Sequence, residues 1–206
     1  MSIGDRIFAA MYDRMMKSSE EAGLGARREA LLAHASGRVL EIGAGTGCNL
    51  AYYGDGVQSL VLTEPGEPMA RRLEHRLEAE RRPVELVRAP AERLPFADGE
   101  FDVAVSTLVL CGVDDQERSL AELRRVLKPG GTLLFIEHVR SEDPGLARKQ
   151  DRFNGLNRLV ARCNCNRSTL DAIRGAGFTV TELERDEIQK APSFVRPLVV
   201  GAATPA

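Results

Sequence analysis

Three glycines at alternate positions, Gly43, Gly45 and Gly47, follow the strand candidate Arg38–Ile42. Because glycine has no Cβ atom, such a loop can turn sharply and let a ligand lie against its backbone. Glu64 comes 21 residues after Gly43, at the end of the next strand candidate. A carboxylate at that point of an α/β sheet suits hydrogen bonds from ribose hydroxyls. The pattern therefore predicts a site for an adenosine-type ligand at the carboxyl ends of the strands.

The glycine spacing also bears on which ligand binds. A dinucleotide loop reads G-x-G-x-x-G, whereas Cys48 stands here where the last glycine would be. Glu41, two positions before the first glycine, is poorly placed for an anionic pyrophosphate and well placed for a cation. Both features argue against NAD and an NAD-dependent oxidoreductase, and favour a ligand that carries an ammonium and a sulfonium.

Short β-rich runs alternate with helical patterns along the chain, which is typical of a mostly parallel sheet covered on both faces. We predict an α/β, Rossmann-like fold with a seven-stranded sheet and helices on both faces. A helix is also expected to begin near Thr46 and to point its amides toward the ligand. The expected strands are Arg38–Ile42, Ser59–Thr63, Val84–Arg88, Phe101–Ser106, Thr132–His138, Thr179–Leu183 and Leu198–Ala202.

The first 35 residues precede the first strand candidate. Ile3, Ile7, Met11 and Met15 recur every four residues, so one face of a helix is apolar. This pattern predicts a helix that packs on the domain or acts as a lid over a ligand; a surface-binding helix is the disfavoured alternative, because its polar face is not strongly basic.

Composition excludes several classes of protein. The chain has 206 residues and a formal net charge of −2, which offers no electrostatic footprint for nucleic acid. No apolar stretch approaches the length of a membrane span, so we expect no integral membrane association. Four cysteines are too few and too unevenly spaced for a disulfide framework. These features predict a cytoplasmic protein with reduced thiols.

Four ordered motifs give the chain a family resemblance. After the loop Glu41–Gly47 come Ala91–Phe96, Phe101-Asp102 and Leu123–Gly131. Together they resemble the class I S-adenosylmethionine-dependent methyltransferases, of the type 11-like branch, over roughly residues 37–140. The resemblance implies S-adenosylmethionine as the cofactor and a single methyltransferase domain over residues 1–206. Within it, residues 1–35 would form a helical lid and residues 141–167 an acceptor-side cap.

The resemblance also implies which residues bind the cofactor. Glu41 would lie near its amino group, Glu64 would hold its ribose, and Glu92 would lie at the adenine edge. Pro90 stands where relatives often carry an aspartate, so that contact with the adenine amino group must come from elsewhere. The full set implied is Glu41, Gly43, Ala44, Gly45, Gly47, Asn49, Glu64, Pro65, Met69, Ala91, Glu92, Thr107 and Leu108.

A narrower resemblance concerns the methyl acceptor. Thr107–Cys111, Ile136–Val139, Cys163-Asn164 with Arg167, and Arg196-Pro197 resemble the thiol S-methyltransferase branch and its soluble bacterial relatives. It implies a small-molecule acceptor, with a thiol as the first expectation. A lipid-like or quinone acceptor methylated on oxygen, carbon or nitrogen is the alternative, and a non-catalytic S-adenosylmethionine-binding module is the alternative from another class. The sequence does not indicate an oligomeric state.

His138 is the candidate catalytic residue. It follows a strand candidate at the edge where the cleft should open, where it could be a general base, orient the acceptor, or simply be a hydrogen-bonded strand-end histidine. Tyr12, Cys163 and Arg167 are the candidates for acceptor binding. We predict no metal site, because Cys163-Asn164-Cys165 lacks a second pair of ligands.

Overall fold

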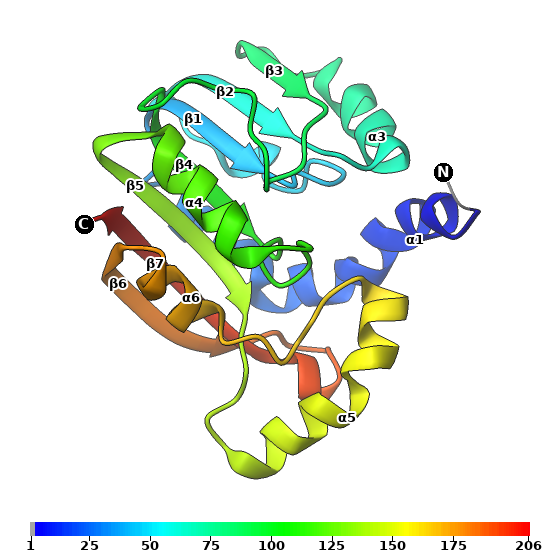
Figure 1. Ribbon diagram of the computed structural model, residues 1–206. Helices are drawn as coiled ribbons and strands as arrows, with labels where there is room; N and C mark the ends of the chain where they lie inside the picture. Colours follow the sequence, from blue (N-terminus) through cyan, green and yellow to red (C-terminus); the bar gives the residue numbers. More distant parts are fainter. Residues whose placement is uncertain (1–2) are drawn as a thin grey trace.

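A seven-stranded sheet forms the centre of the molecule in the computed structural model, which describes residues 3–206 (Figure 1). The strand order is β3-β2-β1-β4-β5-β7-β6, and β7 alone runs in the direction opposite to the other six strands. The strands are β1 (Gly37–Ile42), β2 (Val57–Thr63), β3 (Val84–Val87), β4 (Phe101–Thr107), β5 (Leu127–His138), β6 (Phe178–Glu187) and β7 (Pro197–Pro205). All seven predicted strands and the predicted fold class are thereby confirmed.

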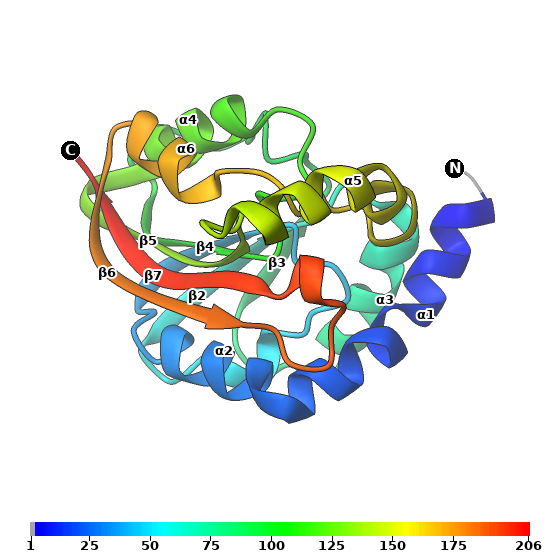
Figure 2. The same cartoon turned by 90° about the horizontal axis from the view of Figure 1, so that it is seen from below.

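Helices cover both faces of the sheet (Figure 2). α4 and α6 lie over one face and α2 and α3 over the other, while α1 and α5 lie toward the carboxyl ends of the parallel strands. The helices are α1 (Ile3–Ser19), α2 (Gly25–Leu32), α3 (Glu67–Leu77), α4 (Gln116–Val126), α5 (Pro144–Ala161) and α6 (Thr169–Gly175), with a π-helical turn (Glu20–Leu24) between α1 and α2 and 3-10 turns at Leu50–Tyr52 and Ser193–Val195.

Alternation along the strands builds two separate apolar cores. On β5, Leu133 and Phe135 pack toward α4 and α6, whereas Leu134 and Ile136 pack toward α2. This follows from the two-residue period of a strand, which sends successive side chains to opposite faces. The sheet is therefore held rigidly from both sides, and its carboxyl edge is fixed in position.

Two local expectations differ from the structure. No α-helix begins near Thr46; the chain forms turns and the 3-10 helix Leu50–Tyr52 instead. A helix has little room here, because only six residues separate Gly47 from the turn at Gly54. The last of these six, Tyr53, is also held in place by the hydrogen bond from its hydroxyl to Glu41. α5 was not predicted; it lies in the segment 141–167, for which the sequence indicated no regular element.

The predicted N-terminal helix is present as α1, but its apolar stripe does not pack on the domain. Ile7, Met11 and Met15 are 54%, 50% and 44% exposed, and the side chain of Ile3 lies outside the described part of the chain. The adjacent side of α1, with Phe8 and Tyr12, lines the cleft at the sheet edge. No helix among residues 3–206 is long and apolar enough to cross a membrane.

Gly201 on β7 provides a test of this packing. A Cβ atom there would lie 2.3 Å from the carbonyl oxygen of Glu182 and 2.8 Å from the Phe135 ring. We expect Gly201→Ala to destabilise the protein by roughly 1–3 kcal/mol through overpacking. The matched control is Gly175→Ala at the end of α6, where a Cβ would meet nothing within 4 Å. Urea unfolding of both variants checks this, and equal stability of the two would contradict it.

Candidate active site

A cleft of about 720 Å³ opens at the carboxyl ends of β1, β2 and β4. Its walls come from the glycine loop, the segment after β2, the segments after β3 and β4, α1, and the end of α5. The lining residues include Tyr12, Gly43, Gly45, Glu64, Pro65, Met69, Ala91, Glu92, Leu108 and Arg162. A cleft at this edge, beside the switch in strand order between β1 and β4, is where open α/β sheets bind ligands.

The three loop glycines adopt positive φ angles of 56°, 59° and 86°, for Gly43, Gly45 and Gly47. A Cβ at Gly43 would lie 2.6 Å from Val109, and one at Gly47 would lie 2.7 Å from Leu73, so both positions are closed by packing. At Gly45 the nearest atom would be a backbone oxygen 3.9 Å away. Gly45 therefore leaves open space on the cleft side, where a ligand can lie against the backbone.

Glu64 lines the cleft and is 7% exposed. Its carboxylate accepts hydrogen bonds from the amides of Gly45 at 2.9 Å and Gly66 at 2.7 Å. Burial raises the pKa of Glu64, although the two amides oppose the shift. Each carboxylate oxygen has lone pairs beyond these amides. A negative acceptor beside an open glycine fits the ribose and the positive charge of an S-adenosylmethionine molecule.

Glu41 lies beneath the glycine loop and not on the cleft surface. It is 3% exposed and accepts hydrogen bonds from the Tyr53 hydroxyl at 2.7 Å and the Asn49 amide at 2.9 Å. Burial raises its pKa to about 7, against the effect of these two donors. The carboxylate therefore supports the loop from below.

Arg28 on α2 completes this network and was not among the predicted site residues. Its guanidinium is buried and pairs with Glu20, while one nitrogen donates to Asn49 Oδ1 at 2.8 Å and Thr107 Oγ1 at 2.9 Å. Burial opposes its charge, but the Glu20 carboxylate outweighs burial and raises the pKa of Arg28. One side chain thus joins the N-terminal helices to the loop and to the end of β4.

Of the remaining implied cofactor residues, some line the cleft and others support it. Met69, Pro65, Ala91 and Leu108 line it, as does Glu92, whose carboxylate accepts from the Asp114 and Asp115 amides. Those that lie outside the lining are Glu41, Ala44, Gly47, Asn49 and Thr107.

Another wall of the cleft comes from two helices. α1 contributes Asp5, Phe8 and Tyr12, and the end of α5 contributes Ala161 and Arg162. The Arg162 guanidinium pairs with Asp5 and lies 5.5 Å from the centre of the Phe8 ring. Burial raises the pKa of the Tyr12 hydroxyl, so it stays protonated at neutral pH. Tyr12 is therefore the one predicted acceptor residue that lines the cleft.

The loop after β4 is held by Glu137, a third buried carboxylate, which was not among the predicted site residues. It accepts from the Ser106 hydroxyl at 2.7 Å and from the amides of Val109, Leu110 and Cys111 at 3.0, 3.0 and 3.2 Å. This anchoring holds Leu108 at a φ of 61°, a conformation that non-glycine residues rarely adopt. Leu108 is thereby turned toward the cleft.

His138, Cys163 and Arg167 are not among the lining residues of the cleft. The Nδ1 atom of His138 lies 3.3 Å from Cys163 Sγ and 3.6 Å from Cys111 Sγ. Contact with Cys163 and burial raise the pKa of Cys111 well above its ordinary value. One Arg167 nitrogen donates to the carbonyls of Leu110 and Val113, so it fixes a loop.

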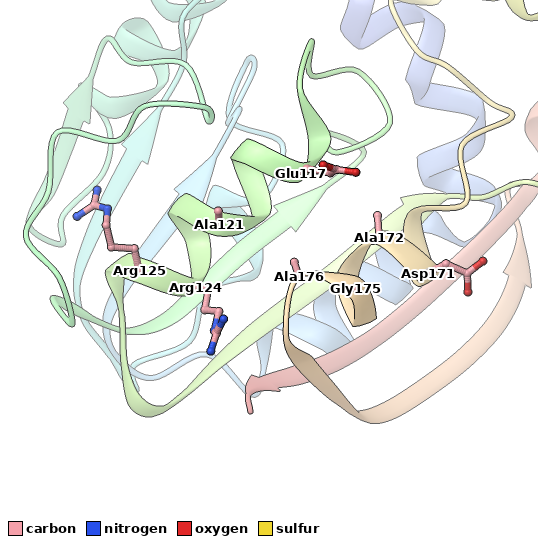
Figure 3. Close-up of a pocket in the computed structure, with 8 residues that line it drawn as sticks. All are labelled: Glu117, Ala121, Arg124, Arg125, Asp171, Ala172, Gly175 and Ala176. Atoms are coloured by element: carbon pink, nitrogen blue, oxygen red, sulfur yellow. The ribbon is translucent and has the colours of Figure 1, made fainter.

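A second hollow, of about 660 Å³, lies between α4 and α6 (Figure 3). Its lining includes Arg125 and Asp171, whose side chains point away from the space between the helices. Arg125 is also paired with Glu122 and Asp98. Most of the predicted cofactor residues line the first cleft, and none of them lines this hollow.

Comparison with known proteins agrees with this geometry. The family model described as "Methyltransferase domain" matches residues 40–135. Human thiol S-methyltransferase TMT1A is 33% identical over 95% of this chain and 82% of its own length, and human TMT1B is 36% identical over 84% and 73%. A Thermotoga maritima structure, described as a SAM-dependent methyltransferase and possible histamine N-methyltransferase, has a TM-score of 0.73 and 27% identity, with both chains fully covered.

The fold and the cleft are those of an α/β protein that binds a nucleotide-like ligand at the carboxyl ends of its parallel strands. The relatives identify it further: the chain belongs to the S-adenosylmethionine-dependent methyltransferases. It is an enzyme, and S-adenosylmethionine is its cofactor.

The buried Arg28 network leads to a prediction about stability. We expect Arg28→Met to cost roughly 3–5 kcal/mol, because it leaves Glu20 and Asn49 without their partner in a buried site. Arg27→Met is the matched control: Arg27 pairs with Glu184 and Asp186 at the surface, and its loss should cost less than about 1 kcal/mol. Chemical unfolding measures both costs; similar values for the two arginines would contradict the account.

The raised pKa of Glu41 predicts a pH dependence. Its folded pKa of about 7 exceeds the ordinary value, so the stability it contributes is present at acidic pH and lost as the pH rises toward 7. Measured at pH 5 and pH 8, wild-type stability should therefore fall relative to that of Glu41→Gln as the pH rises. Glu85→Gln, at an exposed position on β3, should follow the wild type. If the stability difference between Glu41→Gln and the wild type is the same at both pH values, the pKa of Glu41 is not raised by burial and the account is contradicted.

Proposed function

We propose that this enzyme transfers the methyl group of S-adenosylmethionine to a small thiol. The observation that carries the proposal is the lining of the cleft, where the described residues include no histidine, lysine or cysteine. Of the carboxylates that line it, Glu64 and Glu92 accept hydrogen bonds from backbone amides, and Asp5 pairs with Arg162. A thiol has a thiolate accessible near neutral pH and needs little help from a base, whereas a phenol or a carbon acid needs a stronger one. The human relatives named thiol S-methyltransferases support the same acceptor.

The cofactor-binding residues are also part of this proposal. Glu64 would hold the ribose hydroxyls, Gly45 would give the cofactor access to the loop backbone, and Glu92 would lie at the adenine edge. Glu41 and Asn49 would act through the loop they support. When bound, S-adenosylmethionine supplies an electrophilic methyl group on a sulfonium, and transfer to a thiolate yields a thioether and S-adenosylhomocysteine.

The protein's own contribution is then alignment and exclusion of water. Tyr12, as a protonated phenol, can donate a hydrogen bond to the acceptor. Phe8, Leu108 and Val109 supply an apolar surface for the acceptor's carbon skeleton. The thiol proton leaves to solvent, since no protonatable base is required at the cleft.

A lid and a cap complete the proposed organisation. Residues 3–35 of the predicted lid 1–35 include α1, which lines the cleft, and the predicted cap 141–167 includes α5, whose end lies against α1. The Arg162–Asp5 pair and the Arg162–Phe8 contact support a closed arrangement of the two segments. Residues 1 and 2 lie outside the described part of the chain.

Replacing Glu64 tests the proposed cofactor contacts. Glu64→Ala should weaken the binding of S-adenosylmethionine by roughly 5- to 150-fold, which corresponds to about 1–3 kcal/mol for lost hydrogen bonds to a charged group. Equilibrium dialysis with labelled cofactor measures the change. Glu85→Ala, which removes an exposed carboxylate from β3, should leave the affinity unchanged. Wild-type affinity in a folded Glu64→Ala protein would remove Glu64 from the site.

The acceptor is tested by offering the enzyme two thiols of different pKa, a phenol and a quinol. We expect methyl thioethers from both thiols, and pH–rate profiles that shift with the pKa of the thiol, because the thiolate is the reactive form. Mass spectrometry of the products identifies the methylated atom. Methylation of the phenol or quinol without methylation of either thiol would overturn the thiol proposal.

The same profiles address His138, which the sequence predicts as a base. If the His138 imidazole accepts the thiol proton, the pH–rate profiles of both thiols should show the same pKa, which belongs to the enzyme. That pKa should then be missing from the profile of His138→Gln. If the rate follows each thiol's own pKa, His138 is not the base, and its contacts with Cys111 and Cys163 account for its position.

A further inference from the structure

Three side chains from distant parts of the chain meet behind one wall of the cleft. Cys111 lies in the loop after β4, His138 ends β5, and Cys163 follows α5. Their Sγ, Nδ1 and Sγ atoms all lie within 4.8 Å of one another. Within residues 3–206 no other group of three histidines, cysteines or carboxylates has this arrangement.

We propose that Cys111, His138 and Cys163 bind a thiophilic divalent cation, with Zn²⁺ as the representative ion. Zn²⁺ binds cysteine sulfur at about 2.3 Å and histidine nitrogen at about 2.1 Å in tetrahedral sites, which sets the ligand atoms about 3.6 Å apart. The observed Nδ1 to Sγ distances are 3.3 and 3.6 Å. The two nitrogen–sulfur distances are therefore already close to the edge length of a zinc tetrahedron, and the two sulfur atoms lie within 4.8 Å of each other.

Burial and charge agree with a cation of this type. Cys111 and Cys163 are 1% and 7% exposed. Two thiolates and a neutral imidazole balance the charge of Zn²⁺, so the occupied site leaves no net charge in a buried position. The Glu137 carboxylate next to this site accepts four hydrogen bonds from Ser106 and three amides and is not needed as a ligand.

In the sequence, the candidate pair of metal-binding cysteines was Cys163 and Cys165, and not Cys163 and Cys111. Cys163-Asn164-Cys165 was the only close cysteine pair, and it predicted no metal site. In the structure Cys165 turns to Asn154, with its Sγ 3.8 Å from Oδ1, and Cys163 meets residues that are 52 and 25 positions away. Cys165 is therefore a matched control: a buried cysteine two residues from a ligand.

The site would stiffen the cleft wall. Gly112 and Arg162 line the cleft, and each is the direct neighbour of a proposed ligand. The Asn164 amide also donates to the Cys111 carbonyl at 2.8 Å, so the two segments are already joined there. A cation would fix three elements together, with its fourth position left to water. This inference does not depend on the identity of the methyl acceptor.

Cobalt binding tests the site without any measurement of activity. The full chain, purified under reducing conditions and treated with a chelator, is titrated with Co²⁺, whose thiolate charge-transfer absorption reports cysteine ligation. We expect one equivalent to bind, and Zn²⁺ to displace it. Cys163→Ser, Cys111→Ser and His138→Ala should each weaken binding by at least about tenfold, since even the loss of outer-shell partners costs 10–100-fold. Cys165→Ser should bind as the wild type does.

X-ray absorption of the zinc-loaded wild type keeps the test valid if a variant fails to fold. Two sulfur ligands at about 2.3 Å and nitrogen or oxygen at about 2.1 Å are expected. The proposal is overturned if the wild type shows no thiolate charge transfer, or if Cys165→Ser loses binding as Cys163→Ser does. The first result would mean that the thiols and the imidazole are held by hydrogen bonds alone, and the second that the ligand set is not Cys111, His138 and Cys163.

Discussion

A buried guanidinium ties the glycine loop to the rest of the molecule. Arg28 can remain charged in the interior only because Glu20, Asn49 and Thr107 surround it, and a buried charge without partners would cost several kcal/mol. The same Asn49 donates to Glu41, which also accepts from Tyr53. The position of α2, the course of the loop and the end of β4 therefore depend on one another, and the cleft inherits its shape from this network.

On the opposite face of the sheet from Glu41, another buried carboxylate holds a second loop of the cleft in position. Glu137 accepts hydrogen bonds from three backbone amides of the loop after β4 and so turns Leu108 toward the cleft. Parallel strands bring both anchors to the same edge, because all their carboxyl ends meet there. Glu64, at the end of β2, lines the cleft and accepts hydrogen bonds from the amides of Gly45 and Gly66. Glu41 and Glu137 thus support the loops, whereas Glu64 lines the cleft, although the three glutamates look equivalent in the sequence.

Local signals explain what could be predicted from the sequence. The alternation of short β-rich runs with helical patterns is a property of short segments, and the fold class was predicted correctly from it. The methyltransferase class was predicted correctly from the resemblance of four ordered motifs. Arg28 was missed because arginine is almost never fully buried unless it is paired, and its partners Glu20, Asn49 and Thr107 come from three separate segments. Cys111 and Cys163 meet only through tertiary structure, so spacing could not join them. The helix expected near Thr46 failed because six residues before Gly54 leave no room for it. The base role of His138 stays a prediction.

Calorimetric titration of the wild-type chain with S-adenosylhomocysteine, with NAD⁺ as the control, tests the central claim most directly. The account predicts saturable one-to-one binding of S-adenosylhomocysteine and no heat of binding with NAD⁺, because the loop has Cys48 in place of the dinucleotide glycine and Glu41 beneath it. Binding of NAD⁺ without a response to S-adenosylhomocysteine would contradict the account and return the loop to a dinucleotide-binding interpretation.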